Sequence, residues 1–134
     1  MTPILIFLAQ CCPLLFFNYG FRIIDSSAFS ERPDAGSILL DSKDAAFFFS
    51  CERDQIWLEI RSKYDSRKNN WYSFDLWRGL LTGVLPETAQ MNEDNARFLQ
   101  ERLPELIELL KRPRVTTTLK KLDALREART KRRL

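Results

Sequence analysis

Residues 46–61 read AFFFSCERDQIWLEIR, and this stretch decides the fold. Its last six positions alternate strictly, as expected of a strand with one buried face. One face receives Ile56, Leu58 and Ile60, and the other receives Trp57, Glu59 and Arg61. The preceding Ala46 to Cys51 also predicts a strand, and its three consecutive phenylalanines indicate that both faces are at least partly covered. Because the short polar Glu52 to Gln55 joins the two strands, the stretch predicts an antiparallel hairpin with one face partly in water.

Further strand signals precede this hairpin. Phe21 to Asp25 and Ser37 to Ser42 are short apolar strands, and we expect Ser26 to Gly36 to be a turn-rich loop because it contains Pro33-Asp34. After Arg61 only helix signals follow.

The C-terminal half contains three helix signals. Ser73 is a candidate N-cap for a helix that ends at Gly83, and Asn92 is a candidate cap for a second helix, which Pro104 should kink or restart. Residues 116–118 are possible caps for a third. Residues 1–134 therefore predict one α+β domain with an N-terminal helix, about four mostly antiparallel strands and a C-terminal helical half.

The first 17 residues are apolar but do not match a targeting segment. A signal peptide begins with a positive charge and ends at small residues, whereas no lysine or arginine precedes Arg22. The run is interrupted by Pro13 and is shorter than the about 20 residues of a membrane-spanning helix. We expect a buried first helix in a cytoplasmic protein that does not use a membrane. Its core residues should be Ile4, Leu5, Leu8, Leu14 and Phe17.

The residue types present disfavour most catalytic and metal chemistry. The chain has no histidine, which is the usual acid–base residue near neutral pH and the commonest zinc ligand. Its three cysteines, Cys11, Cys12 and Cys51, lack the C-x-x-C spacing of zinc sites and are odd in number. We expect reduced, buried thiols, no metal, no cofactor and no catalytic residue.

Charge divides the chain into an acidic body and a basic tail. Residues 111–134 contain ten basic and two acidic residues, so the remaining 110 contain eleven basic and sixteen acidic ones. The tail could bind phosphates, and its candidate residues are Lys120, Lys121, Arg126, Arg129, Arg132 and Arg133. It lacks aromatic residues on which bases stack, and the acidic body would repel a polyanion. The alternative is a solvated helix that packs its leucines on the body and partly complements the acidic surface.

One pattern is compatible with an enzyme. Asp41, followed across a hairpin by Glu59-Ile60-Arg61, loosely resembles the PD-(D/E)xK nucleases, in which carboxylates on adjacent strands hold magnesium. Arg61 occupies the position of the expected lysine, and Pro33-Asp34 lies in a predicted loop. The alternative is an ordinary solvated strand face.

Aromatic and charged residues form a third set of candidates. Tryptophan, tyrosine and arginine are the residues that most often anchor protein interfaces. Strand alternation or a loop position should expose five candidates for partner binding: Trp57, Glu59, Arg61, Asp65 and Tyr72. The alternative is that the later helices cover this face and Trp57 belongs to the core.

Three segments carry a resemblance. Tyr19–Ser26, Trp71–Asp75 and Leu80–Gly83 resemble segments of small bacterial immunity proteins from toxin–immunity systems. The resemblance implies a protein that binds a cognate toxin domain and blocks it without chemistry, and it assigns no site residue. We therefore expect a protein-binding inhibitor of immunity type. A nucleic-acid-associated regulator that uses the tail is the second hypothesis, and a metal-dependent nuclease is the third.

Overall fold

The computed structural model describes residues 2–29 and 32–132, which form one antiparallel sheet and five helices. In chain order these are α1 (Thr2–Cys11), α2 (Pro13–Phe17), β1 (Arg22–Phe29), β2 (Arg32–Asp41), β3 (Ala45–Glu52), β4 (Gln55–Ser62), β5 (Tyr72–Ser73), α3 (Phe74–Thr82), α4 (Glu93–Leu110) and α5 (Val115–Arg132). The strands are arranged in sequence order, and β5 is a two-residue strand that the sequence did not predict. The predicted α+β class is confirmed.

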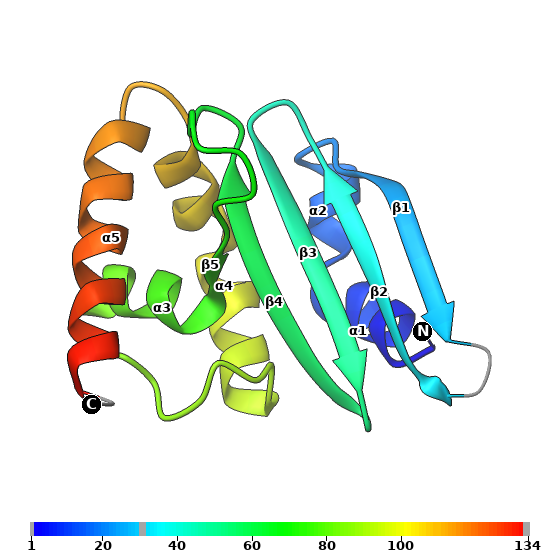
Figure 1. Cartoon of the computed structure of the whole chain (residues 1–134). Helices are drawn as coiled ribbons and strands as arrows, with labels where there is room; N and C mark the ends of the chain where they lie inside the picture. The colour runs from blue at the N-terminus through cyan, green and yellow to red at the C-terminus, as the bar shows by residue number, and fades with distance from the viewer. Residues whose placement is uncertain (1, 30–31, 133–134) are drawn as a thin grey trace.

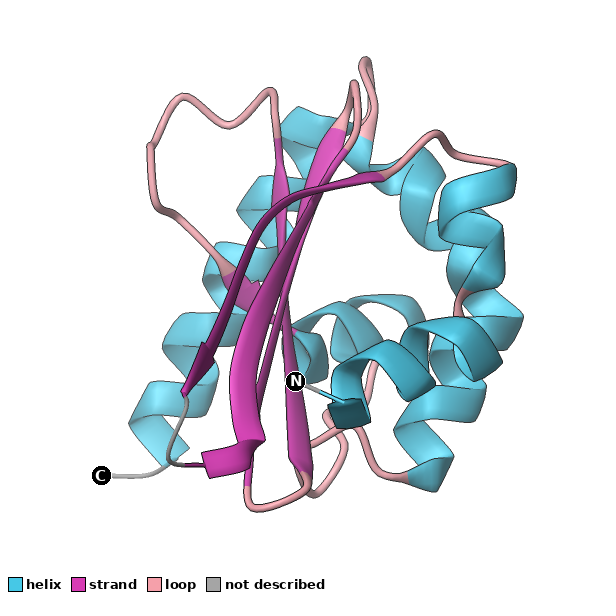
Figure 2. Ribbon diagram, turned by 90° about the vertical axis from the view of Figure 1, so that its right-hand side faces the viewer, coloured by secondary structure: helices cyan, strands magenta, loops and turns pink. Residues whose placement is uncertain are grey.

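The helices leave one face of the sheet uncovered. Figure 1 shows α1, α2 and α4 behind the strands, while α3 and α5 lie beyond the β4–β5 edge. The inner face packs against α1, and the ring centroids of Phe7 in α1 and Phe49 in β3 are 5.8 Å apart. In Figure 2 the sheet is seen nearly edge-on, with the N-terminal helices on one side of it only.

The central hairpin forms as predicted. β3 pairs with β4 so that Phe49 lies opposite Leu58, and both are buried. Arg53 and Asp54 form the turn with φ of 53° and 64°, the left-handed conformation that suits the right-handed twist of a two-residue hairpin. Residues on the inner side therefore enter the core, as the alternation in β4 requires.

The predicted loop from Ser26 to Gly36 is wrong. Most of this segment is strand, because β1 extends to Phe29 and β2 begins at Arg32. β2 pairs with β3 from Gly36, opposite Cys51, and β3 ends at Glu52, so residues 32–34 extend beyond β3. Proline lacks a backbone donor and is tolerated where one edge of a strand is unpaired, which explains why Pro33-Asp34 does not end the strand.

The N-terminal segment forms two helices, because Pro13 starts a new helix at its first turn. Ile4 and Leu8 are buried as predicted. The prediction is wrong for Leu5, Leu14 and Phe17, which are 47%, 41% and 84% exposed. A helix on a sheet buries only one side, and the apolar run is apolar on every side. Of the helices within residues 2–29 and 32–132, none is long and apolar enough to cross a bilayer.

The capping predictions for the two middle helices hold in part. α3 ends at Gly83 with φ of 83°, and the side chain of Asn92 accepts a hydrogen bond of 2.8 Å from the backbone N–H of Asn95. Ser73 precedes α3 but makes no side-chain cap bond. Pro104 neither breaks nor restarts α4, because it lies on the exposed side of a continuous helix.

The predicted start of the last helix is displaced. Residues 116–118 lie inside α5, which begins at Val115. Thr118 is buried and donates its hydroxyl to the carbonyl of Arg114 at 3.1 Å, so it bonds backward along the helix and does not cap it.

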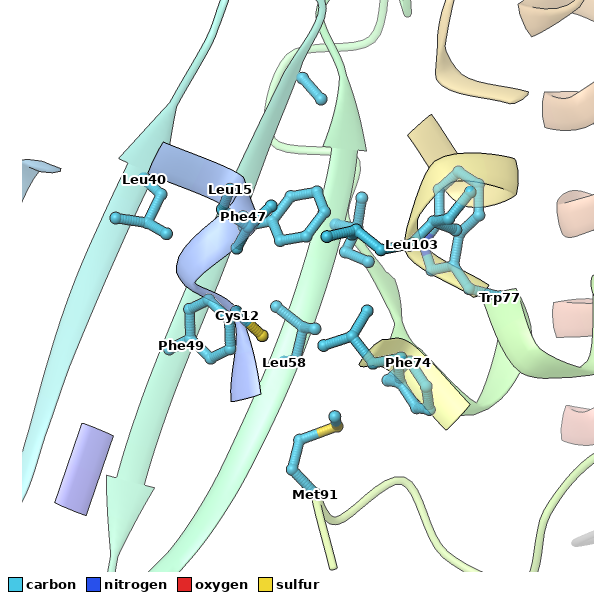
Figure 3. Packing of buried hydrophobic residues seen from close by; sticks show 14 of the residues in the cluster. Cys12, Leu15, Leu40, Phe47, Phe49, Leu58, Phe74, Trp77, Met91 and Leu103 are labelled. Atoms are coloured by element: carbon cyan, nitrogen blue, oxygen red, sulfur yellow. The ribbon is translucent and has the colours of Figure 1, made fainter. Parts of the chain in front are cut away.

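One hydrophobic core joins the sheet to all five helices described. Figure 3 shows Phe47, Phe49 and Leu58 on the inner face of the sheet, close to Cys12 and Leu15. Phe74, Trp77 and Leu103 lie beyond Leu58, toward the C-terminal helices. Cys12 and Cys51 are buried, as expected, whereas Cys11 is half-buried. Burial, and secondarily the neighbouring Cys11, raises the pKa of Cys12 to about 12, so this thiol is a neutral apolar group at physiological pH.

Candidate protein-binding face

The uncovered face of the sheet consists of three rows of side chains. Directly opposed residues on antiparallel strands share a face, so the pairing fixes each row. We call this surface the open face; it is formed by Ser37, Ser50 and Trp57, then Leu39, Phe48 and Glu59, then Asp41, Ala46 and Arg61. No helix crosses it over β1–β4 in Figure 1.

Trp57 is the most exposed large side chain of the open face. It is 37% exposed and borders a hollow of about 350 Å³ whose lining includes Phe48, Ser37 and Ser50. Trp57 also bridges to Gln90, which fixes this end of β4. The prediction that the later helices leave Trp57 accessible is confirmed. An exposed indole beside a hollow can receive an apolar group of a partner.

Glu59 is a half-buried carboxylate at the centre of this face. Phe48 lies opposite it on β3 and Ser73 on β5. Desolvation by its neighbours raises the pKa of Glu59. Within the described part of the chain no group forms an ion pair or hydrogen bond with its carboxylate. Glu59 therefore loses solvation and gains no partner in the isolated protein.

The guanidinium of Arg61 forms hydrogen bonds within the protein. Its Nη2 donates to the carbonyls of Asp65 at 3.3 Å and Arg67 at 3.4 Å, so the guanidinium holds residues 65–67 over the end of the open face. Its buried Nε has no acceptor among the described atoms. Arg61 is accordingly half-buried and is less suited to contact a partner than the sequence predicted.

Asp65 and Tyr72 are buried, so the prediction that they are exposed is wrong. Asp65 is 5% exposed and is enclosed by Arg67 and Asn70 of its own loop, whereas Tyr72 is fully buried against Asp123 and Arg126 of α5. The Tyr72 hydroxyl donates to Asp123 of α5 and receives hydrogen bonds from Asn70 at 3.0 Å and Arg67 at 2.9 Å. We call this set the polar cluster; it comprises Asp65, Arg67, Asn70, Tyr72, Asp123 and Arg126.

The pKa values in the polar cluster follow from its hydrogen bonds. Burial alone would raise the pKa of Asp65, but hydrogen bonds from Asn70 at 2.7 Å and from the backbone and side chain of Arg67 outweigh it and lower that pKa. Burial, and then the hydrogen bond to Asp123, raises the pKa of Tyr72. At physiological pH Asp65 is therefore ionised and can accept the hydrogen bonds of Arg67 and Asn70, while Tyr72 is neutral and keeps the proton that it donates to Asp123.

Two arginines of the basic tail are occupied in the same way. Arg126 donates to Asn70 at 3.0 Å and lies 4.5 Å above the centre of the Tyr72 ring. Arg129 pairs at 2.6 Å with Asp75, whose side chain is 6% exposed. Their prediction as phosphate-binding residues is therefore disfavoured, because both attach α5 to the acidic body.

The rest of the tail is more open. Lys120, Lys121 and Arg132 are exposed on α5. Arg133 lies outside the described residues. The nucleic-acid hypothesis therefore depends on a smaller basic surface than the sequence predicted, and it stays a prediction.

The nuclease pattern is dispersed in the structure. Asp41 and Glu59 share the open face but are separated by β3, and Asp41 pairs with Lys63. The guanidinium of Arg61 is directed to loop carbonyls. Over residues 2–29 and 32–132, no three cysteine, aspartate or glutamate side chains gather as a metal site would require. The nuclease hypothesis stays a prediction without a grouped set of ligands.

Comparison with family models, with curated proteins and with solved structures gives no match to this chain. The functional interpretation must come from the residues of the molecule itself.

Proposed function

We propose that the protein is a non-catalytic inhibitor of immunity type that binds a cognate bacterial toxin through its open face. The observation that carries the proposal is that Trp57, which borders a hollow, and Glu59, a desolvated carboxylate without a partner among the described residues, lie on the same face. The resemblance of Tyr19–Ser26 to immunity proteins supports it. The protein acts in the cytoplasm by occupying the toxin, with no cofactor and no membrane.

Glu59 defines the chemistry of the partner. A buried polar group without a partner is costly, so a cation or N–H donor of the toxin that reaches Glu59 gains a charge-assisted hydrogen bond. Part of the desolvation of this carboxylate has already occurred in the free protein. An arginine or lysine of the toxin is the matching group, and its arrival should lower the pKa of Glu59.

The charge of the body favours the same kind of partner. The first 110 residues contain sixteen acidic and eleven basic side chains, and Arg126 and Arg129 of the tail are directed inward. Complementary fields accelerate and orient association. A basic toxin domain, such as one that acts on nucleic acid, fits this surface.

The experiment is affinity capture of partners from the native host, followed by titration of the recovered protein. Trp57→Ala and Glu59→Gln should each weaken a one-to-one complex about thirtyfold, as expected of an interface anchor. Matched controls are Val84→Ala, which removes an exposed apolar side chain beyond the end of α3, and Glu101→Gln, which removes an exposed carboxyl on α4. These controls should bind normally.

Two results would contradict the proposal. One is the absence of a stoichiometric protein partner together with a magnesium-dependent nuclease activity that Glu59→Gln abolishes. The other is a complex that loses affinity with Glu101→Gln and keeps it with both open-face variants. Unfolding curves of all four variants exclude loss of the fold as the cause.

A further inference from the structure

Exposed apolar side chains are concentrated in the first 24 residues. Among the described residues eight large hydrophobic side chains are exposed, and six of them lie in this segment. We call these six the edge patch: Leu5 (47% exposed), Ile6 (50%), Leu14 (41%), Phe17 (84%), Ile23 (48%) and Ile24 (52%). No charged residue precedes Arg22. Apolar side chains that are exposed together in one segment mark a candidate interaction site.

The edge patch lies on β1, at the edge of the sheet, and on the N-terminal helices α1 and α2. Figure 2 views the molecule from this side, with β1 in front and the N-terminal helices beside it. Phe7 and Cys11 line a hollow together with Ala96 of α4, and Leu5 points away from that side of α1. Ile23 lies opposite the buried Leu40, so it faces the helical layer. The exposed apolar residues of α1 and β1 thus border the same edge.

β1 is an edge strand that is open along its length. It pairs with β2 alone, and its side chains from Arg22 to Ala28 are all exposed. The outer edge of such a strand presents backbone N–H and C=O groups that a further strand can pair with. A strand added there would also cover Ile23 and Ile24.

We propose that the occupant is the β1 strand of a second copy of this chain, antiparallel to the first about a two-fold axis. The sequence Arg22-Ile23-Ile24-Asp25 is its own complement when it is read in the opposite direction. An axis between Ile23 and Ile24 therefore sets Arg22 of each copy against Asp25 of the other. Two-fold interfaces require this self-complementarity.

A bulge in β1 makes this charge pairing possible. Residues three apart on a regular strand point to opposite faces. Here Arg22 lies opposite Asp41, Asp25 lies opposite Leu39, and Ile24 is skipped in the pairing with β2. Asp41 and Leu39 both belong to the open face, so Arg22 and Asp25 also share one face. Each arginine can then meet an aspartate on the same side of the joined sheet.

Other occupants fit the patch less well. Helices that lie in a lipid surface combine an apolar side with a lysine- and arginine-rich side, and residues 2–21 contain neither lysine nor arginine. An unrelated protein would not account for the self-complementary order of charges in Arg22–Asp25. The edge lies apart from Trp57 and Glu59 of the open face, so pairing of copies leaves the proposed toxin-binding surface accessible.

The test is sedimentation equilibrium of the full chain over a range of concentrations. We expect a reversible dimer whose dissociation constant rises at least tenfold in Ile24→Lys and is unchanged in Val84→Lys, which places the same charge on an exposed valine outside the patch. A monomer at every concentration, or equal effects of the two variants, overturns the proposal.

Charge reversal provides a second, independent measurement. Arg22→Asp and Asp25→Arg should each weaken the dimer, and the double variant should restore it because the opposite charges again meet. Failure of the double variant to recover overturns the proposed register. Binding of monomers to vesicles of neutral phospholipid, lost in Ile24→Lys, would instead assign the patch to a membrane surface and would also overturn the proposal.

Discussion

Glu59 and Asp65 are carboxylates close together in sequence, yet their environments shift their pKa values in opposite directions. Asp65 is almost fully buried and receives hydrogen bonds from Arg67 and Asn70, so its pKa is lowered. Glu59 is only half-buried, has no partner among the residues described, and has a raised pKa. A satisfied buried charge is explained by the fold. The desolvated carboxylate of Glu59 has no such role in the fold, and we attribute it to the binding of another molecule.

The largest effect should come from the polar cluster. Asp65→Ala removes the acceptor of Arg67 and Asn70 and leaves their donors in a covered site. We expect a loss of about 2–3 kcal/mol in the free energy of unfolding, measured in urea. Glu59→Ala should change it by less than about 0.5 kcal/mol. Equal losses in the two variants would contradict the distinction between the two carboxylates.

The second effect concerns the attachment of α5. Arg129→Ala leaves the buried carboxylate of Asp75 without its cation, so we expect a loss of about 1–2 kcal/mol. Lys131→Ala is the matched control, because Lys131 pairs with Glu127 in an exposed position where such pairs contribute little. Thermal unfolding of both variants measures the difference. If Lys131→Ala costs as much as Arg129→Ala, α5 is not held by the buried pair.

The third effect is on the pH dependence of stability, to which Asp65 and Glu59 contribute with opposite signs. Stability from Asp65 is present above the ordinary aspartate pKa and is lost as the pH falls through its lowered value. The favourable state of Glu59 is the protonated one, so its contribution is lost as the pH rises through its raised pKa. Relative to Glu59→Gln, the wild type should therefore lose stability as the pH rises from the ordinary glutamate pKa of about 4.3 through the raised pKa of Glu59. Relative to Asp65→Asn it should gain stability as the pH rises from the lowered pKa of Asp65 to the ordinary aspartate pKa of about 3.9, which is below the range in which Glu59 acts.

The smallest effect should come from the exposed lysines of α5. Lys120→Gln combined with Lys121→Gln removes two charges that point to solvent, and we expect a change in stability within about 0.5 kcal/mol. We also expect no change in nucleic-acid binding, measured by fluorescence anisotropy at several salt concentrations. Tight binding whose salt dependence falls in the double variant would support the nucleic-acid hypothesis instead.

The sequence was most informative where side-chain pattern and backbone geometry coincide. The alternation of Ile56, Leu58 and Ile60 specified which side of β4 is buried, and Gly83 and Asn92 marked helix ends because their roles are local. The prediction of a loop from Ser26 to Gly36 was wrong because its turn-forming residues lie where β2 extends past β3. A strand with no neighbour on one side needs fewer backbone hydrogen bonds, so it tolerates these residues. Local composition does not reveal which strand lies on either side.

The candidate site was predicted only in part for a related reason. Trp57 and Glu59 lie on the face that alternation exposes, and the structure leaves that face open. Tyr72 was misjudged because Asp123, which accepts its hydrogen bond, is more than fifty residues away in the chain, and Asp65 was misjudged because Arg67, which encloses it, also binds Asp123. The exposure of Phe17 was missed because an apolar run gives no sign of which side meets the sheet. Contacts between distant segments decide these cases.

The polar cluster also has a consequence for the order of events during synthesis. β1 to β4 pair in sequence order and could form as the chain emerges, since each hairpin is local. Tyr72 lacks its acceptor Asp123 and the guanidinium of Arg126 until these residues are translated. Completion of the polar cluster should therefore require the last tenth of the chain. A nascent chain arrested before Asp123 should show slow hydrogen exchange in β3 and β4 but fast exchange across residues 63–71, and protection of both regions at that stage would contradict this order.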